Sequence, residues 1–124
     1  DNHKTFIMGY CFGGSAALEL ARSGNGNNIV GYASFHGGVK TPEGQEYTSN
    51  TPPIFIAHGG ADKAVKLEDV FEVTNELEKN KIFYEVNIYS GAPHAFTVFN
   101  SQRYRKEADE KSWEAFLSFV NKTM

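Results

Sequence analysis

Hydrophobic residues along the chain gather in four short runs, separated by polar loops and by segments with helical spacing. Three runs, at residues 5–10, 29–35 and 54–58, are almost continuously apolar, which is typical of strands buried on both faces of a parallel sheet. The fourth run, at residues 84–89, alternates polar and apolar side chains, so one face or edge of that strand should be wetter. The pattern therefore predicts four strands.

Three segments with helical spacing lie between or after these runs. Residues 15–22 form an alanine- and leucine-rich stretch that a Ser-Gly pair closes. Between residues 67 and 77 apolar positions recur at steps of three and four, as in an amphipathic helix. The predicted stripe there consists of Leu67, Val70, Phe71, Thr74 and Leu77. A last helix is predicted from about residue 107 to 121, and its predicted buried residues are Trp113, Phe116, Leu117 and Val120.

The remaining long segments, residues 39–53 with three prolines and residues 90–105, are predicted to be loops. Strands that alternate with helices predict an α/β domain of about four mainly parallel strands. Helices should flank the sheet in three layers, joined by right-handed crossovers. In such sheets ligands bind at the carboxyl ends of the strands, so candidate chemistry is expected in the residues that follow each strand.

Composition narrows the class of protein. A chain of 124 residues suits one domain. A formal net charge of −3 argues against a nucleic-acid-binding surface, and no apolar run approaches the ~20 residues of a membrane helix. The single cysteine excludes an internal disulfide and a redox dithiol. No targeting segment is visible, and the cytoplasm is the default location.

The exit of the first strand carries the strongest motif. Gly9-Tyr10-Cys11-Phe12-Gly13 follows the nucleophile-elbow pattern, with cysteine in place of serine. The elbow needs glycine at both flanks, because a side chain there would collide with neighbouring backbone. At the start of a helix the dipole favours a thiolate, and the Phe12 amide could donate to an oxyanion. The alternative is a buried cysteine beside packing glycines.

A carboxylate and a histidine follow two later strands. Asp62 comes after the third strand and could orient an imidazole, although aspartate also suits turns. His94 follows the fourth strand and could act as general base to Cys11. Asp69 is a rival carboxylate, but it lies within a predicted helix. The chain order nucleophile, acid, histidine is the order of α/β-hydrolases.

The other histidines are weaker candidates for a general base. His3 precedes the first strand, on the opposite edge of the predicted sheet. His36 and His58 end the second and third strands, so they line a pocket or pack in the core. A metal site built from Cys11, His58, Asp62 and His94 is conceivable but lacks any familiar ligand spacing, so it is a weak alternative.

These segments resemble the dienelactone hydrolase family of α/β-hydrolases, whose reference activity is carboxymethylenebutenolidase. The resemblance rests on segments spread over almost the whole chain, namely residues 9–14, 34–38, 58–62, 93–97, 104–109 and 112–113. It implies that Cys11 is the nucleophile, Asp62 the triad acid and His94 the base. It also implies that the Phe12 amide is one oxyanion donor, and that no cofactor is needed. Tyr10, His36 and Phe96 are candidates for the substrate pocket.

Two departures from the family pattern bear on this prediction. The resemblance covers only the C-terminal half of the family's fold, so residues 1–124 are expected to be a single partial domain. Dienelactone-specific members place an arginine four residues after the histidine, where this chain has Val98; Arg103 and Arg105 follow in sequence. A small ester or lactone in general, rather than dienelactone, is therefore the expected substrate.

A partial sheet has a further consequence. The strand at residues 5–10 would be central in the complete fold, but here it should present an unpaired, apolar edge. We expect this edge to be covered by a second copy, by strand exchange or by the missing N-terminal half. The chain alone should have low activity. The alternative to an enzyme is a non-catalytic α/β module that binds a partner through the same edge.

Overall fold

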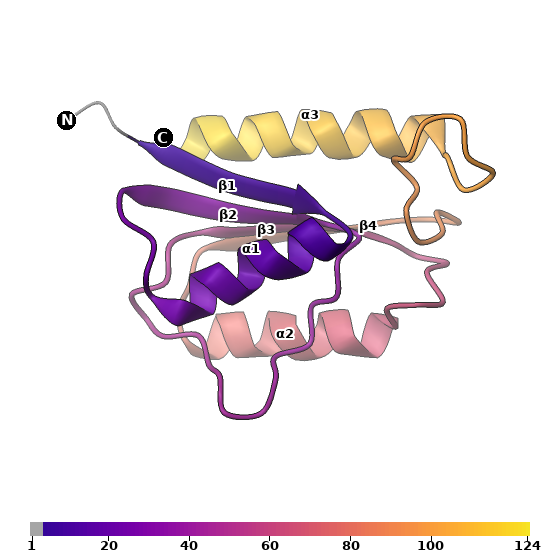
Figure 1. Ribbon diagram of the computed structural model, residues 1–124. Coiled ribbons are helices and arrows are strands. Elements are labelled where there is room, and N and C mark those ends of the chain that lie inside the picture. Colours follow the sequence, from indigo (N-terminus) through magenta and orange to yellow (C-terminus); the bar gives the residue numbers. More distant parts are fainter. Residues whose placement is uncertain (1–3) are drawn as a thin grey trace.

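A computed structural model describes residues 4–124 (Figure 1). Within that range the sheet has the strand order β1-β2-β3-β4, and all neighbouring strands are parallel. The strands are β1 (Thr5–Tyr10), β2 (Ile29–Phe35), β3 (Ile54–Gly59) and β4 (Tyr84–Tyr89). The helices are α1 (Phe12–Ser23), α2 (Leu67–Lys79) and α3 (Lys106–Thr123). The predicted α/β class with parallel strands is confirmed.

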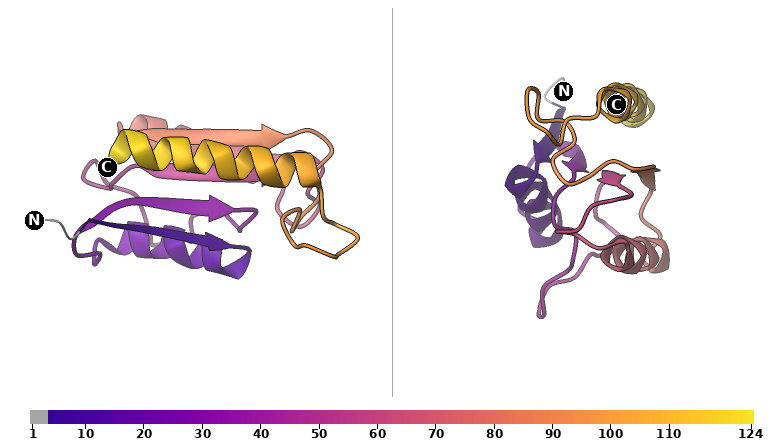
Figure 2. Two further views of the ribbon diagram at one scale, coloured as in Figure 1. Left: turned by 90° about the horizontal axis from the view of Figure 1, so that it is seen from above. Right: turned by 90° about the vertical axis from the view of Figure 1, so that its right-hand side faces the viewer.

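The helices lie on both faces of the sheet, with α1 and α2 on one face and α3 on the other (Figures 1 and 2). Alternation along the strands divides the core accordingly. In β3, Ile54 and Ile56 pack toward α1 and α2, whereas Phe55 and Ala57 pack toward α3. All four of these side chains are fully or almost fully buried, which explains why this strand is continuously apolar in sequence.

Two helices bury faces that differ from the predicted ones. In α3 the buried residues are Ala108, Ser112, Phe116 and Phe119. Trp113 is 42% exposed and Leu117 is 46% exposed, so the prediction for these two residues is wrong. In α2, Val73 is buried while Phe71 is 54% exposed. In both helices, large apolar side chains that flank the buried face were predicted to be part of the core because of their residue type alone.

Strand β1 forms one edge of the described sheet, since it pairs only with β2. Residues 6–8 of this strand are half-buried, Thr5 and Tyr10 at its ends are exposed, and Gly9 is buried. Because all strands are parallel, their carboxyl ends meet at one edge. The Cys11 elbow, the β2 exit, the β3 loop and the β4 loop therefore converge there. No helix in residues 4–124 is long and apolar enough to cross a membrane.

Candidate active site

The chain turns sharply between β1 and α1, and Cys11 stands at the turn. Its φ of 52° and ψ of −119° are unusual for a residue other than glycine. Its carbonyl accepts hydrogen bonds from the N–H groups of Gly14 and Ser15, at 3.0 and 3.1 Å. Phe12 is the first residue of α1, so its own N–H has no intrahelical acceptor. These features present the cysteine side chain and a free amide at the same corner.

The two glycines of the motif are not equivalent. A Cβ added at Gly9 would lie 2.3 Å from the backbone C and O atoms of Gly13, so this crossing requires glycine. A Cβ at Gly13 would meet no atom within 4 Å among the described residues, and the predicted collision at that position is wrong there. The second close approach occurs instead at Gly14, where a Cβ would lie 2.3 Å from Ser34 Oγ of β2.

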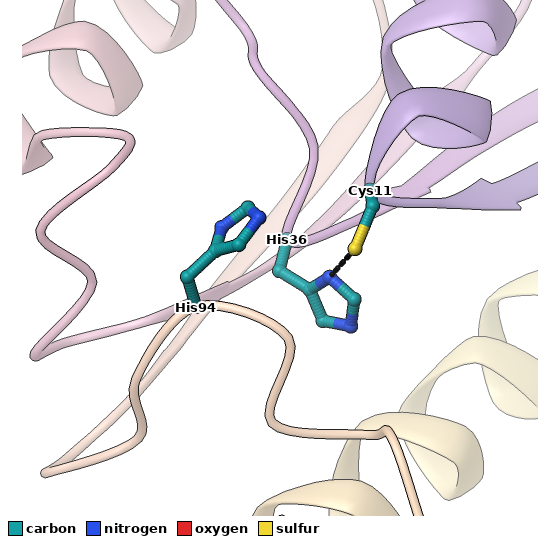
Figure 3. Close-up of side chains that lie close together, drawn as sticks. All are labelled: Cys11, His36 and His94. Atoms are coloured by element: carbon teal, nitrogen blue, oxygen red, sulfur yellow. Dashed lines mark hydrogen bonds between the residues drawn. The ribbon is translucent and has the colours of Figure 1, made fainter. Parts of the chain in front are cut away.

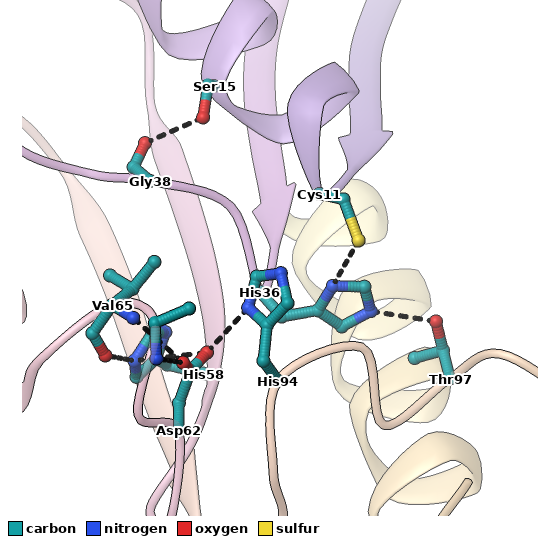
Figure 4. A network of polar contacts seen from close by, with 10 residues as sticks. Cys11, Ser15, His36, Gly38, His58, Asp62, Val65, His94 and Thr97 are labelled. Carbon is teal, nitrogen blue, oxygen red and sulfur yellow. Dashed lines mark hydrogen bonds and ion pairs between the residues drawn. The ribbon is translucent and has the colours of Figure 1, made fainter. Parts of the chain in front are cut away.

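Asp62 and His94 form a direct pair (Figure 4). Oδ2 of Asp62 accepts a hydrogen bond from Nδ1 of His94 at 2.9 Å, and Oδ1 accepts from the N–H groups of Ala64 and Val65, each at 2.8 Å. Burial by itself raises the pKa of Asp62, but these hydrogen bonds and the nearby imidazole outweigh it, and the net pKa is lowered. A carboxylate held in this way fixes one tautomer of His94, with the proton on Nδ1. The rival Asp69 lies in the first turn of α2.

The sulfur of Cys11 contacts a histidine that the sequence did not single out as its partner. Figure 3 shows the sulfur facing the ring of His36. Sγ lies 3.2 Å from Nδ1 of His36, and Nε2 of His36 lies 2.8 Å from Oγ1 of Thr97. His36 is fully buried and has a positive φ of 42°. Burial, with a further contribution from nearby His94, lowers the pKa of His36 to about 4, so the ring is uncharged at neutral pH.

His36 could have been found from topology. The register pairs Tyr10 of β1 with Phe35 of β2, so the residues that follow these two strands, Cys11 and His36, are neighbours at the sheet edge. Thr97 belongs to the loop after β4 and gives no comparable signal in sequence.

Cys11, His36 and His94 lie close together (Figure 3). One possible ligand atom of each, the sulfur and two ring nitrogens, lies within 4.8 Å of the others. The rings of His36 and His94 meet edge to face, with centroids 5.6 Å apart. In this arrangement the sulfur is hydrogen-bonded to His36, and His94 stands beside it.

The charge state of the cysteine differs from the expected one. Burial raises the pKa of the Cys11 thiol, the negative charge of Asp62 raises it further, and the positive charge of Arg103 lowers it. The net pKa is raised, so the sulfur is a thiol at neutral pH. This direction is opposite to the preference for thiolate expected from the start of a helix.

The pocket candidates occupy different depths. Tyr10 is 40% exposed, and its ring lies over those of Phe35 and His36. Phe96 has no exposed surface and packs 5.1 Å from the ring of His36, so it supports that ring rather than lining a surface hollow.

A hollow of about 460 Å³ lies beside His94, and Lys63, Pro93 and Arg103 also line it. Arg103 is shared with a second hollow of about 310 Å³, which Val98 also lines. The guanidinium of Arg105 donates instead to the carbonyls of Gln102 and Tyr104. Of the two arginines considered from sequence, Arg103 is therefore the one beside the site.

His58 supports the loop that carries Asp62. It is fully buried, its Nε2 donates to the Val65 carbonyl at 2.9 Å, and that nitrogen lies 3.8 Å from Oδ2 of Asp62. His58 therefore acts on Asp62 and not on Cys11. His3 lies outside the described residues.

Comparison with known proteins gives a consistent result. The model of the dienelactone hydrolase family matches residues 1–124. The chain is 31% identical to the "Putative carboxymethylenebutenolidase" of Saccharolobus solfataricus over 122 residues, covering 96% of this chain and 44% of that protein. It is 30% identical to the "Probable 2-oxo-3-(5-oxofuran-2-ylidene)propanoate lactonase" of Bradyrhizobium sp., covering 92% of this chain and 48% of that protein.

Among solved structures, the dienelactone hydrolase-like promiscuous phosphotriesterase P91 from metagenomic libraries matches with a TM-score of 0.84 and 27% identity. That match covers 99% of this chain and 54% of the solved one. The chain thus spans about half the length of these three proteins.

Proposed function

The chain belongs to the dienelactone hydrolase family, and on that premise we propose that the protein hydrolyses a small carboxylic ester or lactone through Cys11, His94 and Asp62. The observation that carries the proposal is the pair formed by Asp62 and His94 beside the elbow cysteine, with Nδ1 of His94 bound to the carboxylate at 2.9 Å. That bond leaves the lone pair on Nε2, where a general base needs it.

The first half-reaction forms a thioester. The sulfur turns from His36 toward His94, and Nε2 of His94 takes the thiol proton as Sγ attacks the carbonyl carbon. Because the pKa of the Cys11 thiol is raised, the proton is transferred during the attack rather than lost beforehand. The Phe12 N–H donates to the developing oxyanion. The C–O bond of the ester then breaks, and the imidazolium returns its proton to the leaving alkoxide.

The second half-reaction releases the acid. Water attacks the thioester carbonyl while Nε2 of His94 accepts its proton, and the proton then passes to the departing sulfur. Asp62 stays ionised throughout because its pKa is lowered. Its negative charge stabilises the imidazolium that forms in both half-reactions. No metal or organic cofactor takes part in any of these steps.

The substrate is proposed to be small, with an anionic group tolerated. Arg103 lies at the hollow beside His94, and its charge acts on the Cys11 sulfur. A carboxylate or another anion on the substrate would be attracted there.

A matched pair of carboxylate variants tests the proposal. With a p-nitrophenyl ester as substrate and the full-length protein, Asp62→Asn should lower kcat by about 10²–10⁴-fold, whereas Asp69→Asn should leave it unchanged. Cys11→Ala should abolish the acyl adduct seen by mass spectrometry after rapid quenching. Equal activity of Cys11→Ala and the wild type would refute the assignment of Cys11 as the nucleophile. A full-length protein that shows neither turnover nor an acyl adduct on Cys11 would favour the binding module.

A further inference from the structure

The cluster of Cys11, His36 and His94 has the donor set of a metal site. Zn²⁺ in proteins takes thiolate and imidazole ligands, at about 2.3 Å from sulfur and 2.0–2.1 Å from nitrogen. Tetrahedral geometry then places the ligand atoms about 3.5 Å from one another. Here Sγ and Nδ1 of His36 are 3.2 Å apart, and all three ligand atoms lie within 4.8 Å of one another. Side-chain rotations that move the ligand atoms by about 1 Å would complete the tetrahedral geometry.

In both histidines, the ring nitrogen that faces away from the cluster has a hydrogen-bond partner that favours metal binding. A histidine that binds a metal through one ring nitrogen commonly donates the N–H of the other to an oxygen acceptor. His94 donates Nδ1–H to Asp62, and Nε2 of His36 lies 2.8 Å from the hydroxyl of Thr97. Each ring therefore has an oxygen partner on its far side, and its other nitrogen is left for the cluster (Figure 4).

We propose that Cys11, His36 and His94 together bind a thiophilic divalent cation of the Zn²⁺ class, and that this cation reversibly blocks the active site. On binding, the thiol of Cys11 loses its proton to solvent, the thiolate and two neutral imidazoles coordinate the ion, and water fills the fourth position. No electron is transferred. The site is open on one side, since the His94 side chain is 27% exposed, so the ion has an entry path.

The charges around the cluster are mixed. Asp62 contributes a negative charge that favours a cation, and Arg103 contributes a positive charge that opposes it. The affinity for a cation therefore has to come from the ligand atoms and not from the surrounding charges. Thiolate and imidazole ligands select a soft cation over Mg²⁺ or Ca²⁺. The blocking effect rests on the proposed function, because the ion would occupy the sulfur and the lone pair that hydrolysis uses. The binding itself does not rest on it.

Binding can be measured without any activity. The full-length protein, freed of metal with a chelator, is titrated with Zn²⁺ against a chromophoric indicator, and with Co²⁺ while thiolate-to-metal charge-transfer absorption is recorded. We expect one ion per chain, a charge-transfer band, and protection of Cys11 from iodoacetamide by Zn²⁺. Failure of the wild type to show the band or the protection would overturn the proposal, whatever the behaviour of the variants.

Variants locate the ion. His36→Asn is chosen because asparagine tolerates the positive φ at this position, and it should weaken Zn²⁺ binding by at least tenfold. Thr97→Val should weaken it by a smaller factor through the orientation of His36. Asp69→Asn, in the first turn of α2, is the matched control for loss of a metal-binding side chain outside the cluster and should change nothing. Equal Zn²⁺ affinity in His36→Asn, confirmed to be folded by circular dichroism, would refute the site.

The outcomes separate the two proposals. A protein that hydrolyses esters but shows no charge-transfer band keeps the proposed function and loses this inference. A protein that shows the band, with His36 as a ligand, but hydrolyses no ester keeps the cation site and loses the function. Inhibition by Zn²⁺ that EDTA reverses, and that weakens tenfold or more in His36→Asn, supports both.

Discussion

Replacement of Gly9 by alanine should damage both stability and activity. The added Cβ would lie 2.3 Å from the backbone C and O of Gly13, whereas ordinary contact begins at 3.4 Å. The clashing atoms belong to backbone, so β1 and the first turn of α1 must separate by about 1 Å. Overpacking of this kind costs about 1–3 kcal/mol, and the upper end applies because no side chain can rotate away. A shift of about 1 Å at the reacting groups can cost about 10²-fold in rate.

The matched control is Gly13→Ala. Within residues 4–124, and apart from the adjoining residues of α1 itself, no atom lies within 4 Å of a Cβ at that position. Neither glycine has a positive φ. Alanine in the first turn of α1 should therefore stabilise the protein by about 0.5–1 kcal/mol through the lower entropy of the unfolded chain. The pair should differ by roughly 3–4 kcal/mol in the free energy of unfolding.

Urea denaturation followed by circular dichroism measures that difference, and ester hydrolysis under the same conditions measures the effect on the site. At about 4 °C per kcal/mol, the melting temperature of Gly9→Ala should fall by roughly 10 °C. Gly9→Ala with wild-type stability would show that the crossing is looser than its contacts indicate. Equal damage from Gly13→Ala would show that another contact demands the second glycine of the motif.

Three further predictions concern charge, the sulfur and the free edge. Arg103→Gln should raise the KM for an anionic ester several-fold while leaving that for a neutral ester of the same size almost unchanged; equal effects on both would exclude a charge interaction. The same variant should raise the pKa of the Cys11 thiol further, because the wild-type arginine lowers it. Alkylation by iodoacetamide at pH 8 in the presence of EDTA should therefore be slower than in the wild type. The 124-residue chain by itself should scatter light as a species larger than 13.8 kDa, since β1 is an edge strand with partly apolar side chains; a monomer at micromolar concentration would contradict this.

The strands were predictable because their sequence signal is direct. A strand buried on both faces has to be apolar at nearly every position, and residues 29–35 and 54–58 satisfy that requirement. The helix faces were less predictable. Phe119 and Trp113 are both large and apolar, yet Phe119 is fully buried and Trp113 is 42% exposed. Their difference depends on the angle at which α3 lies on the sheet, which the spacing within one helix does not contain.

The candidate site was also predictable only in part. Asp62 and His94 could be paired from sequence because parallel strands bring their exits to one edge. The contact between Cys11 and His36 depends on a side-chain rotation instead. A hydrogen bond is worth about 0.5–1.5 kcal/mol net, so the sulfur can exchange one imidazole partner for another at little cost. His36 is a neighbour of the sulfur because β1 and β2 are adjacent and in register, whereas His94 comes from the loop after β4. The sheet therefore places two histidines around one sulfur, and His36→Asn distinguishes what each contributes: hydrolysis should follow His94, and cation binding should require both.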